Sequence, residues 1–200
     1  VFMVAKEVEV HSKSAVDNDE QGYLWKSSGE DTYELSKKSK DKHGTTIMIH
    51  LNDENKEFID ESRVSFIISK YSQYINFPIY LLAEGMEKKR LNDNEAIWLK
   101  SKRSVKEDEY KEFYKYLSHD FDDPLLWIHN KVEGKQDYSN LLYVPKKSPF
   151  DLWNRDTPKG LKLFIQRVFI MDDAAHFLPI YLRFVKGVID SSDLPLNVSR

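Results

Sequence analysis

The sequence contains no cysteine among its 200 residues, and it has only seven glycines and seven prolines. Without cysteine there can be no disulfide bonds, thiol nucleophiles or cysteine metal sites, which suits a reducing cytoplasm. No apolar run reaches the roughly 20 residues that a membrane helix requires. The opening stretch VFMVAKEVEV has five apolar residues before its first charge, fewer than the roughly 7 to 15 of a secretory signal. We therefore expect a cytoplasmic protein with no membrane contact.

An excess of charge of one sign is also absent, because 30 basic residues stand against 33 acidic ones and the net charge is −3. This balance disfavours a nucleic-acid partner, which requires a basic surface. The hydrophobic content of 40% is enough for one full domain and part of another. The chain opens inside an apolar element without an initiator methionine, so we expect it to be a fragment.

Alternation of apolar and polar residues in the first half predicts an antiparallel meander. The strand that follows Gly44 has the clearest alternation, and we expect it to pair with an earlier strand. Residues 57–74 change to helical spacing and predict a helix that packs on the meander, before an extended run at 79–82. The expected strands cover residues 4–10, 23–25, 33–35 and 44–51.

Dense charge and few large apolar groups at 83–95 are typical of a solvated linker. We therefore divide the chain into residues 1–82, a linker at 83–95, and a second, α/β domain at 96–200. In that domain Ser104 and Glu107 form an S-x-x-E pattern that predicts a capping box and an amphipathic helix. The expected strands cover 125–128, 138–144, 161–170 and 181–189, with a short helix at 173–177.

Two acidic clusters could carry chemistry. The stretch His119–Pro124 (HDFDDP) has the oxygen ligands of a hard-cation site, but a helix-ending histidine and turn-forming aspartates explain it better. Asp172, Asp173 and His176 could form an acid–base group, yet an aspartate before two alanines is a good helix N-cap. We therefore predict no metal site and no catalysis by either cluster.

Large aromatic residues such as Trp98 and Trp127 are expected in the core. The proline-bounded loop PKKSPFDLW could instead leave Phe150 and Trp153 exposed, and exposed apolar patches mark partner sites. We therefore hypothesise a client or partner contact at these two residues. The sequence has no Walker loop, G-x-G-x-x-G, H-E-x-x-H or G-x-S-x-G motif, so it shows no complete active site by itself.

Long segments along the chain resemble the heat-shock protein 90 family. They are FMVAKEV, GTTIMIHL, AIWLKS, DEYKEFYKYLSHDFDDP, VEGKQDYSNLLYVP, SPFDLWNRD, LFIQRVFIMDD and SSDLPLNVSR. The resemblance implies an α+β fold at residues 1–82, the later part of an ATPase sandwich of the gyrase, histidine-kinase and MutL type. It implies that residues 96–200 are the first part of the family's α/β middle domain.

The resemblance also implies the site residues. Thr45, in the GT pair, corresponds to a family threonine that hydrogen-bonds the adenine region, and Val10 and Trp25 fall near that pocket. Arg200 corresponds to a catalytic arginine that the middle domain delivers to the terminal phosphate of ATP. The family's other ATP and Mg²⁺ ligands lie upstream of Val1, so we expect this fragment neither to hydrolyse ATP nor to bind a cofactor tightly.

The function implied is an ATP-driven chaperone clamp that acts on partly folded client proteins. In the family a later domain forms the homodimer, so this piece is expected to be monomeric, with an open sheet edge and apolar surface where the first domain is incomplete. An alternative is a non-catalytic client-binding or partner-binding module that does not depend on Arg200. A topoisomerase or mismatch-repair ATPase of the same fold is disfavoured by the SSDLPLNVSR segment and the charge balance.

Overall fold

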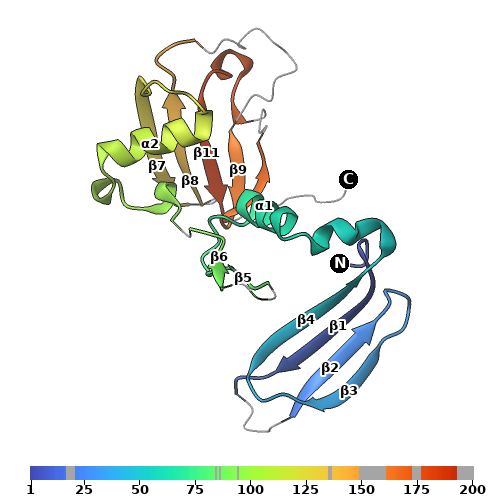
Figure 1. The fold of residues 1–200 in the computed structure, drawn as a ribbon. Helices are drawn as coiled ribbons and strands as arrows, with labels where there is room; N and C mark the ends of the chain where they lie inside the picture. Colours follow the sequence, from blue (N-terminus) through green and yellow to red (C-terminus); the bar gives the residue numbers. More distant parts are fainter. Residues whose placement is uncertain are drawn as a thin grey trace. The chain divides into compact units, whose positions relative to one another are not determined.

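The computed structural model describes residues 1–16, 21–83, 85, 87–93, 95–134, 137–148, 161–172 and 177–192 (Figure 1). Contacts divide the chain into two compact units, Val1–Val64 and Ser65–Arg200. The chain combines helices with β-sheets, so the mixed α+β character predicted from the sequence is confirmed. The domain boundary expected at 83–95 stays a prediction.

The first unit is built on a four-stranded antiparallel sheet with the strand order β3-β2-β1-β4 (Figure 1). The first three strands form the expected meander. The fourth then returns to the other side of the first strand, which confirms the pairing expected for the segment after Gly44. The strands are β1 (Ala5–Lys13), β2 (Gln21–Ser27), β3 (Glu34–Ser39) and β4 (Gly44–Leu51).

Side-chain alternation gives this sheet two chemically different faces. On one face Val10 lies opposite both Trp25 and Ile47 in the strand register. Leu35 and Ile47 on this face are 60% and 59% exposed, so the first unit leaves much of its apolar face uncovered. The other face carries charged and polar groups, among them Glu7, Glu9, Lys26, Thr46 and His50.

The predicted helix at 57–74 is two helices, η1 (Asp53–Ile59) and α1 (Glu61–Tyr71). Asp60 separates them, because its backbone is extended while its carboxylate accepts a hydrogen bond of 3.0 Å from the N–H of Arg63. Within the second unit, Tyr71 and the following Tyr74 pack against the rings of Phe169, Trp98 and Phe164. The packing of the helical region on the meander stays a prediction.

The second unit includes a small hairpin in which β5 (Tyr80–Leu81) pairs with β6 (Lys89–Arg90). Asn92, which is 2% exposed, holds the neighbouring backbone in place. Its side chain accepts a hydrogen bond from the N–H of Ile79 and donates to the carbonyl oxygens of Ile75 and Phe77. Part of the predicted linker is therefore ordered backbone with a buried amide beside it.

The main element of the second unit is a five-stranded sheet with the order β10-β9-β11-β8-β7. The central strand β11 runs parallel to β9 and antiparallel to β8. The helix α2 (Glu107–Ser118) lies across one face of this sheet (Figure 1). The strands are β7 (Leu126–Val132), β8 (Tyr138–Val144), β9 (Lys162–Ile165), β10 (Val168–Met171) and β11 (Lys186–Ser191). The short helices are η2 (Ile97–Leu99), η3 (Lys102–Ser104) and η5 (Ile180–Leu182).

Each face of this sheet has its own apolar cluster. Trp98 from η2 is fully buried between the sheet and the helix, which confirms it as a core residue, and Trp127 is half-buried and stacks on Tyr110. The helix-side cluster includes Tyr74, Trp98, Tyr110, Tyr114, Leu117, Leu141, Tyr143, Phe164 and Val188. The opposite cluster is Leu161, Leu163, Val185 and Ile189. None of the helices in the described ranges is long and apolar enough to cross a membrane.

Three local predictions in this unit are wrong. The strand expected at 161–170 is two strands, because a tight turn at Gln166 and Arg167 reverses the chain. The strand expected at 181–189 begins only at Lys186, after a short helix. The capping residue of α2 is Lys106, whose N–H donates to the carboxylate of Glu109. Ser104 is not the cap, because its hydroxyl bonds the carbonyl oxygen of Ser101 within η3. Most of the short helix expected at 173–177 lies outside the described residues.

Candidate functional site

Three of the predicted site residues lie on one face of the four-stranded sheet. Val10 on β1 pairs with Trp25 on β2, and Ser12, two residues further along β1, pairs with Thr45 on β4. Because residues two apart on a strand point to the same side, Val10, Trp25 and Thr45 share the uncovered apolar face. The sheet register therefore brings together residues that are 35 positions apart in the sequence.

This face offers flat rings and hydroxyl groups. The indole of Trp25 stacks with Tyr33 at a centroid distance of 6.3 Å. At one edge of the face the hydroxyl oxygens of Thr45 and Ser12 lie 2.8 Å apart. Such a surface can stack a planar apolar ring and hydrogen-bond its polar edge. Its described strand residues include no aspartate or glutamate, so they supply no general base to activate water and no carboxylate for a metal ion.

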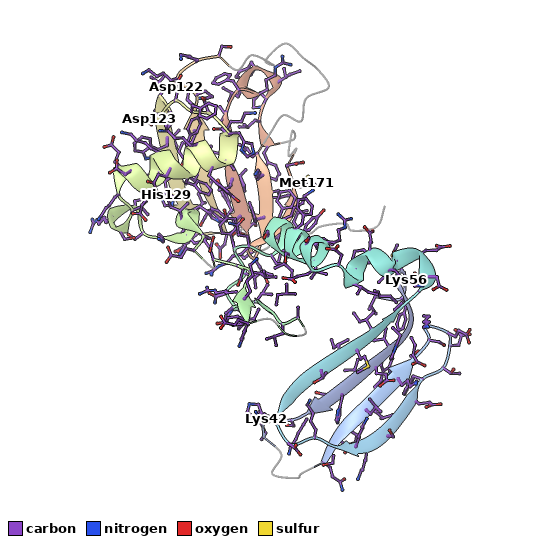
Figure 2. All side chains as sticks on the ribbon, in the orientation of Figure 1. Lys42, Lys56, Asp122, Asp123, His129 and Met171 are labelled. Carbon is purple, nitrogen blue, oxygen red and sulfur yellow. The ribbon has the colours of Figure 1, made fainter. Side chains whose placement is uncertain are left out.

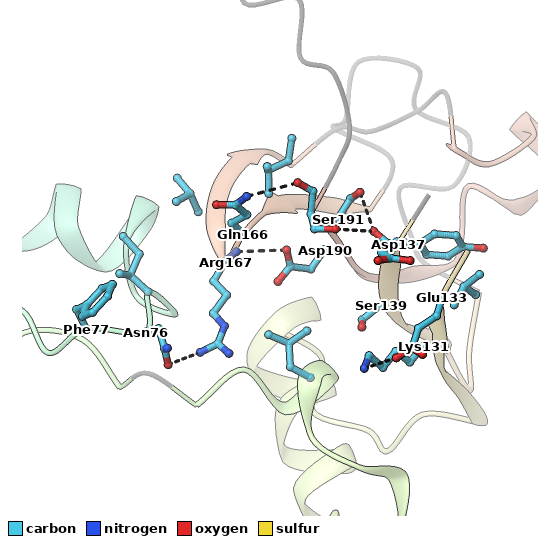
Figure 3. Close-up of a pocket in the computed structure, with 17 residues that line it drawn as sticks. Asn76, Phe77, Lys131, Glu133, Asp137, Ser139, Gln166, Arg167, Asp190 and Ser191 are labelled. Atoms are coloured by element: carbon cyan, nitrogen blue, oxygen red, sulfur yellow. Dashed lines mark hydrogen bonds and ion pairs between the residues drawn. The ribbon is translucent and has the colours of Figure 1, made fainter. Parts of the chain in front are cut away.

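A second feature is a pocket of about 720 Å³ in the second unit, at the C-terminal end of β11 (Figure 3). Asp190 lies beside it and is 5% exposed. One carboxylate oxygen of Asp190 accepts a hydrogen bond of 2.9 Å from Nε1 of Trp98, and the other accepts one of 3.2 Å from the N–H of Arg167. Both oxygens of this buried carboxylate accept a hydrogen bond, so its role here is to fix the backbone around it.

The residues that follow Asp190 are held by their neighbours on both sides. The hydroxyl of Ser191 and the N–H of Ser192 donate to the carbonyl oxygen of Asp137 at 3.0 and 3.2 Å. From the other side, the N–H of Gln166 donates to the carbonyl oxygen of Ser191 at 3.1 Å. The exit of β11, which leads toward Arg200 in the sequence, is thus a well-anchored point.

The turn between β9 and β10 is conformationally strained. Gln166 and Arg167 have φ angles of 47° and 68°, in the left-handed region that L-residues other than glycine rarely adopt. The side chain of Arg167 also donates a hydrogen bond of 2.8 Å to Oδ1 of Asn76 (Figure 3). Strain of this kind persists only where surrounding contacts stabilise it, and it is concentrated at functional positions.

The stretch His119–Pro124 forms the end of a helix and a turn, as the sequence predicted. His119 ends α2 in the left-handed conformation with φ 57°. A hydrogen bond from the Tyr114 hydroxyl lowers the pKa of Asp120, and the hydrogen bond from Lys115 lowers the pKa of Asp123. Figure 2 shows Asp122 and Asp123 in the loop that follows the helix, and Asp122 pairs with Lys147. Lysines, the Tyr114 hydroxyl and backbone groups therefore contact the carboxylates of this turn.

Several candidates lie outside the described residues: Arg200, Phe150, Trp153, Asp173 and His176. Asp172 is described, and its charge acts on Lys162 across the sheet edge. Sequence reasoning missed the roles of Trp98 as a hydrogen-bond donor, of Asp190, and of the turn at Gln166 and Arg167. The spacing of apolar residues in the sequence could not predict these roles, because each role depends on contacts between segments that are far apart in the sequence.

Comparison with known proteins places the chain in a family. The family model described as Hsp90 protein matches residues 83–200. The chaperone protein HtpG of Shewanella amazonensis is 51% identical over the whole chain, which covers 34% of that protein. The HtpG proteins of Citrobacter koseri and Idiomarina loihiensis are 51% and 47% identical, again over the whole chain, which covers 33% and 34% of their lengths. The chain spans about a third of the length of these relatives, and it belongs to the Hsp90 protein family.

Proposed function

We propose that the chain is part of an ATP-driven molecular chaperone that acts on partly folded client proteins. Its first part would contribute to the nucleotide-binding domain, a sandwich of the gyrase, histidine-kinase and MutL type, and its second part would be the beginning of the middle domain. The relatives are named as chaperones, and the ATP-dependent mechanism is our inference for this chain. A cytoplasmic location and a homodimer formed through a later domain belong to the same proposal.

The observation that supports a nucleotide site is the shared position of Val10, Trp25 and Thr45. The register of β1, β2 and β4 places them on one apolar face, where Ile47 is 59% exposed. Adenine is a flat ring with polar edges, so it fits a surface that combines an indole with paired hydroxyl groups. Because the described strand residues of this face lack carboxylates, the Mg²⁺ ligands and the water-activating base would come from other parts of the longer protein.

Arg200 would act as the catalytic residue from the middle domain. A guanidinium next to the terminal phosphate stabilises the charge that spreads over the phosphoryl oxygens during transfer. Its planar fork can hold two oxygens at once, which lysine cannot do. Since the donor comes from a different domain, hydrolysis would occur only when the two domains close on each other. The fragment alone would be inactive.

Steady-state ATP hydrolysis by the full-length protein and its Arg200→Ala variant tests this proposal. We expect turnover to fall at least ~10-fold while nucleotide affinity is retained, because the group acts on the transition state. Arg103→Ala removes an exposed arginine of η3 and is the matched control, which should hydrolyse ATP at the normal rate. Unchanged turnover in Arg200→Ala would contradict the catalytic assignment.

Nucleotide affinity tests the sheet face independently. Thr45→Val keeps the shape of the side chain and removes its hydroxyl, so we expect ATP binding to weaken about 3- to 10-fold, the usual effect of losing one hydrogen bond. Thr46→Val alters the neighbouring residue, whose side chain lies on the opposite face of β4, and should leave the affinity unchanged. Equal affinities in both variants would exclude this face from the nucleotide site.

One observation favours the alternative of a non-catalytic client-binding or partner-binding module. Leu126 and Ile128 on the edge strand β7 are 43% and 47% exposed, and the nearby Phe121 and Leu125 are 96% and 62% exposed. Exposed apolar groups beside an unpaired strand edge are typical of protein-binding surfaces. Client binding that is the same with and without ATP, and the same in Arg200→Ala, would favour this alternative.

A further inference from the structure

A group of side chains that can ligate a metal ion lies on the polar face of the four-stranded sheet. Glu7 and Glu9 are two residues apart on β1 and so point to the same side, and His50 on β4 lies directly opposite Glu7. The potential ligand atoms of all three residues lie within 4.8 Å of one another. A β-bulge between Ala5 and Glu7 sets the register next to this group, and bulges commonly redirect side chains beside sites.

The imidazole of His50 supplies an independent observation. Its Nε2 is almost completely shielded from solvent, although the side chain as a whole is 36% exposed, and it makes no hydrogen bond among the described residues. This atom points at the two carboxylates, 3.7 Å from Oε1 of Glu7 and 3.5 Å from Oε1 of Glu9. Ligand atoms about 2.0 to 2.1 Å from a tetrahedral Zn²⁺ stand about 3.3 to 3.4 Å from each other. The imidazole nitrogen therefore already stands from each carboxylate at nearly the distance that a shared metal ion would impose.

The local charge also favours a cation. Lys26 on β2 places its ammonium 3.0 Å from Glu7 and 3.4 Å from Glu9, so the two carboxylates already attract a positive group. With a neutral imidazole, two carboxylates and one ammonium sum to a charge of −1. The side chain of Lys26 is 37% exposed, so its ammonium can turn outward, and exposed ion pairs of this kind hold it weakly.

We propose that Glu7, Glu9 and His50 form a binding site for a divalent transition-metal ion, with Zn²⁺ as the best match. One imidazole nitrogen and two carboxylate oxygens are ligands that suit Zn²⁺, whereas Mg²⁺ and Ca²⁺ prefer oxygen ligands only. Three protein ligands leave a fourth position for water. The ion would displace Lys26 and link β1 to β4, two strands more than 30 residues apart in the sequence.

Titration of the 200-residue chain with Zn²⁺, followed by calorimetry, tests the ligand set. We expect His50→Ala to weaken binding at least ~10-fold, since changing residues that only hydrogen-bond to metal ligands already has effects of that size. His43→Ala removes an exposed histidine from the turn before β4 and is the matched control, which should bind Zn²⁺ like the wild type. Equal loss in both variants, or no loss in His50→Ala, would overturn the proposal.

Lys26 gives the sharper test, because a site and a simple ion-pair cluster predict opposite results. If Zn²⁺ competes with the ammonium, Lys26→Met should bind Zn²⁺ about 3- to 10-fold more tightly. If the group is only an ion-pair network, Lys26→Met should lower stability and leave Zn²⁺ affinity at the wild-type level, and the proposal fails.

Co²⁺ provides a spectroscopic readout of the geometry. Wild-type protein with Co²⁺ should give the strong visible absorption bands of a four-coordinate N/O site, and His50→Ala should lack them. A spectrum identical to that of aqueous Co²⁺ in the wild type would overturn the proposal. The site lies on the face opposite Thr45 and needs neither ATP nor Arg200, so its failure and that of the chaperone proposal are distinguishable.

Discussion

Nε1 of Trp98 donates a hydrogen bond of 2.9 Å to Oδ2 of Asp190, which lies 92 positions later in the chain. Both side chains are buried, with exposed fractions of 0% and 5%. The bond joins the short helix η2 to the central strand β11, and the other oxygen of Asp190 holds the strained turn at Arg167. One buried carboxylate therefore connects three segments around the exit of β11.

Trp98→Phe removes this donor and leaves an oxygen of the buried Asp190 carboxylate unpaired. We expect the free energy of unfolding to fall by ~2 to 4 kcal/mol, because an unsatisfied charged acceptor adds to the smaller ring volume. Trp127→Phe changes a half-buried indole on the neighbouring strand β7 and is the control, with an expected loss of ~1 kcal/mol or less. Urea unfolding of both variants makes the comparison. Similar losses would show that the hydrogen bond to Asp190 has little energetic weight.

The turn at Gln166 should favour glycine over alanine. Its φ of 47° lies in the left-handed region, which is strained by ~1 kcal/mol for a residue with a Cβ atom. We therefore expect Gln166→Gly to be more stable than Gln166→Ala by ~1 kcal/mol. At Glu112, an exposed position in the middle of α2, the same pair of substitutions should show the opposite order. If the alanine variant were more stable than the glycine variant at both positions, the strain inferred at the turn would be contradicted.

The pair of Tyr114 and Asp120 predicts a loss of stability in acid. The Tyr114 hydroxyl donates a hydrogen bond of 2.8 Å to Asp120 and lowers the pKa of that carboxylate below its ordinary value of 3.8. A carboxylate whose pKa is lowered by folding stabilises the protein above its ordinary pKa, and this contribution is lost as the pH falls through the folded-state pKa. The contribution of Asp120 should therefore begin to decline below about pH 4 and continue to fall at lower pH.

Thermal unfolding of the wild type and Asp120→Asn between pH 7 and pH 3 measures this contribution. The difference in Tm should be largest at neutral pH and should shrink at the acidic end, because the Asp120 carboxylate takes up a proton more readily in the unfolded chain than in the folded one. Asp31→Asn, at an exposed bend of the first unit, is the control and should match the wild type throughout. A difference that stays constant with pH would exclude the carboxylate charge as the cause.

Much of the sheet structure could be predicted from the sequence, because the alternation of apolar and polar residues and the turn-forming residues are both visible in short stretches of the chain. The strand after Gly44 and the helix at Glu107–Ser118 follow directly from their apolar periods. The resemblance to the heat-shock protein 90 family implied Val10, Trp25 and Thr45, and the register shows that they share a face. That register could not be read from the sequence, because it is set by pairing between β1 and β4, which are separated by two other strands.

Other features depended on contacts that no local pattern encodes. The turn at Gln166 and Arg167 lies inside a segment rich in apolar residues and contains no glycine. The sequence therefore predicted a single strand where the structure has two. The expected strand ended at Ile189, yet Asp190 lies inside β11, where Trp98 and Arg167 satisfy its carboxylate. Tertiary hydrogen bonds override local preference at both places.

The charge of Lys162 should be a net cost to stability near neutral pH. Burial on β9 lowers the pKa of this lysine, and the charge of Asp172 compensates only in part. Lys162→Met keeps an unbranched apolar side chain and removes the charge, so we expect the free energy of unfolding at pH 7 to rise by ~0.5 to 1 kcal/mol. Lys131→Met removes an exposed lysine that is paired with Glu133 and should give no such gain.

The advantage of Lys162→Met should also depend on pH in a defined direction. Because folding lowers the pKa of Lys162 below its ordinary value of 10.5, the unfolded chain holds more protons than the folded one as the pH approaches that value. Wild-type stability then rises relative to the variant as the buried amine becomes neutral. Urea unfolding from pH 7 to pH 10 should therefore show the gap closing with increasing pH. A gap that widens with pH would mean that the Lys162 charge stabilises the fold, most directly through Asp172.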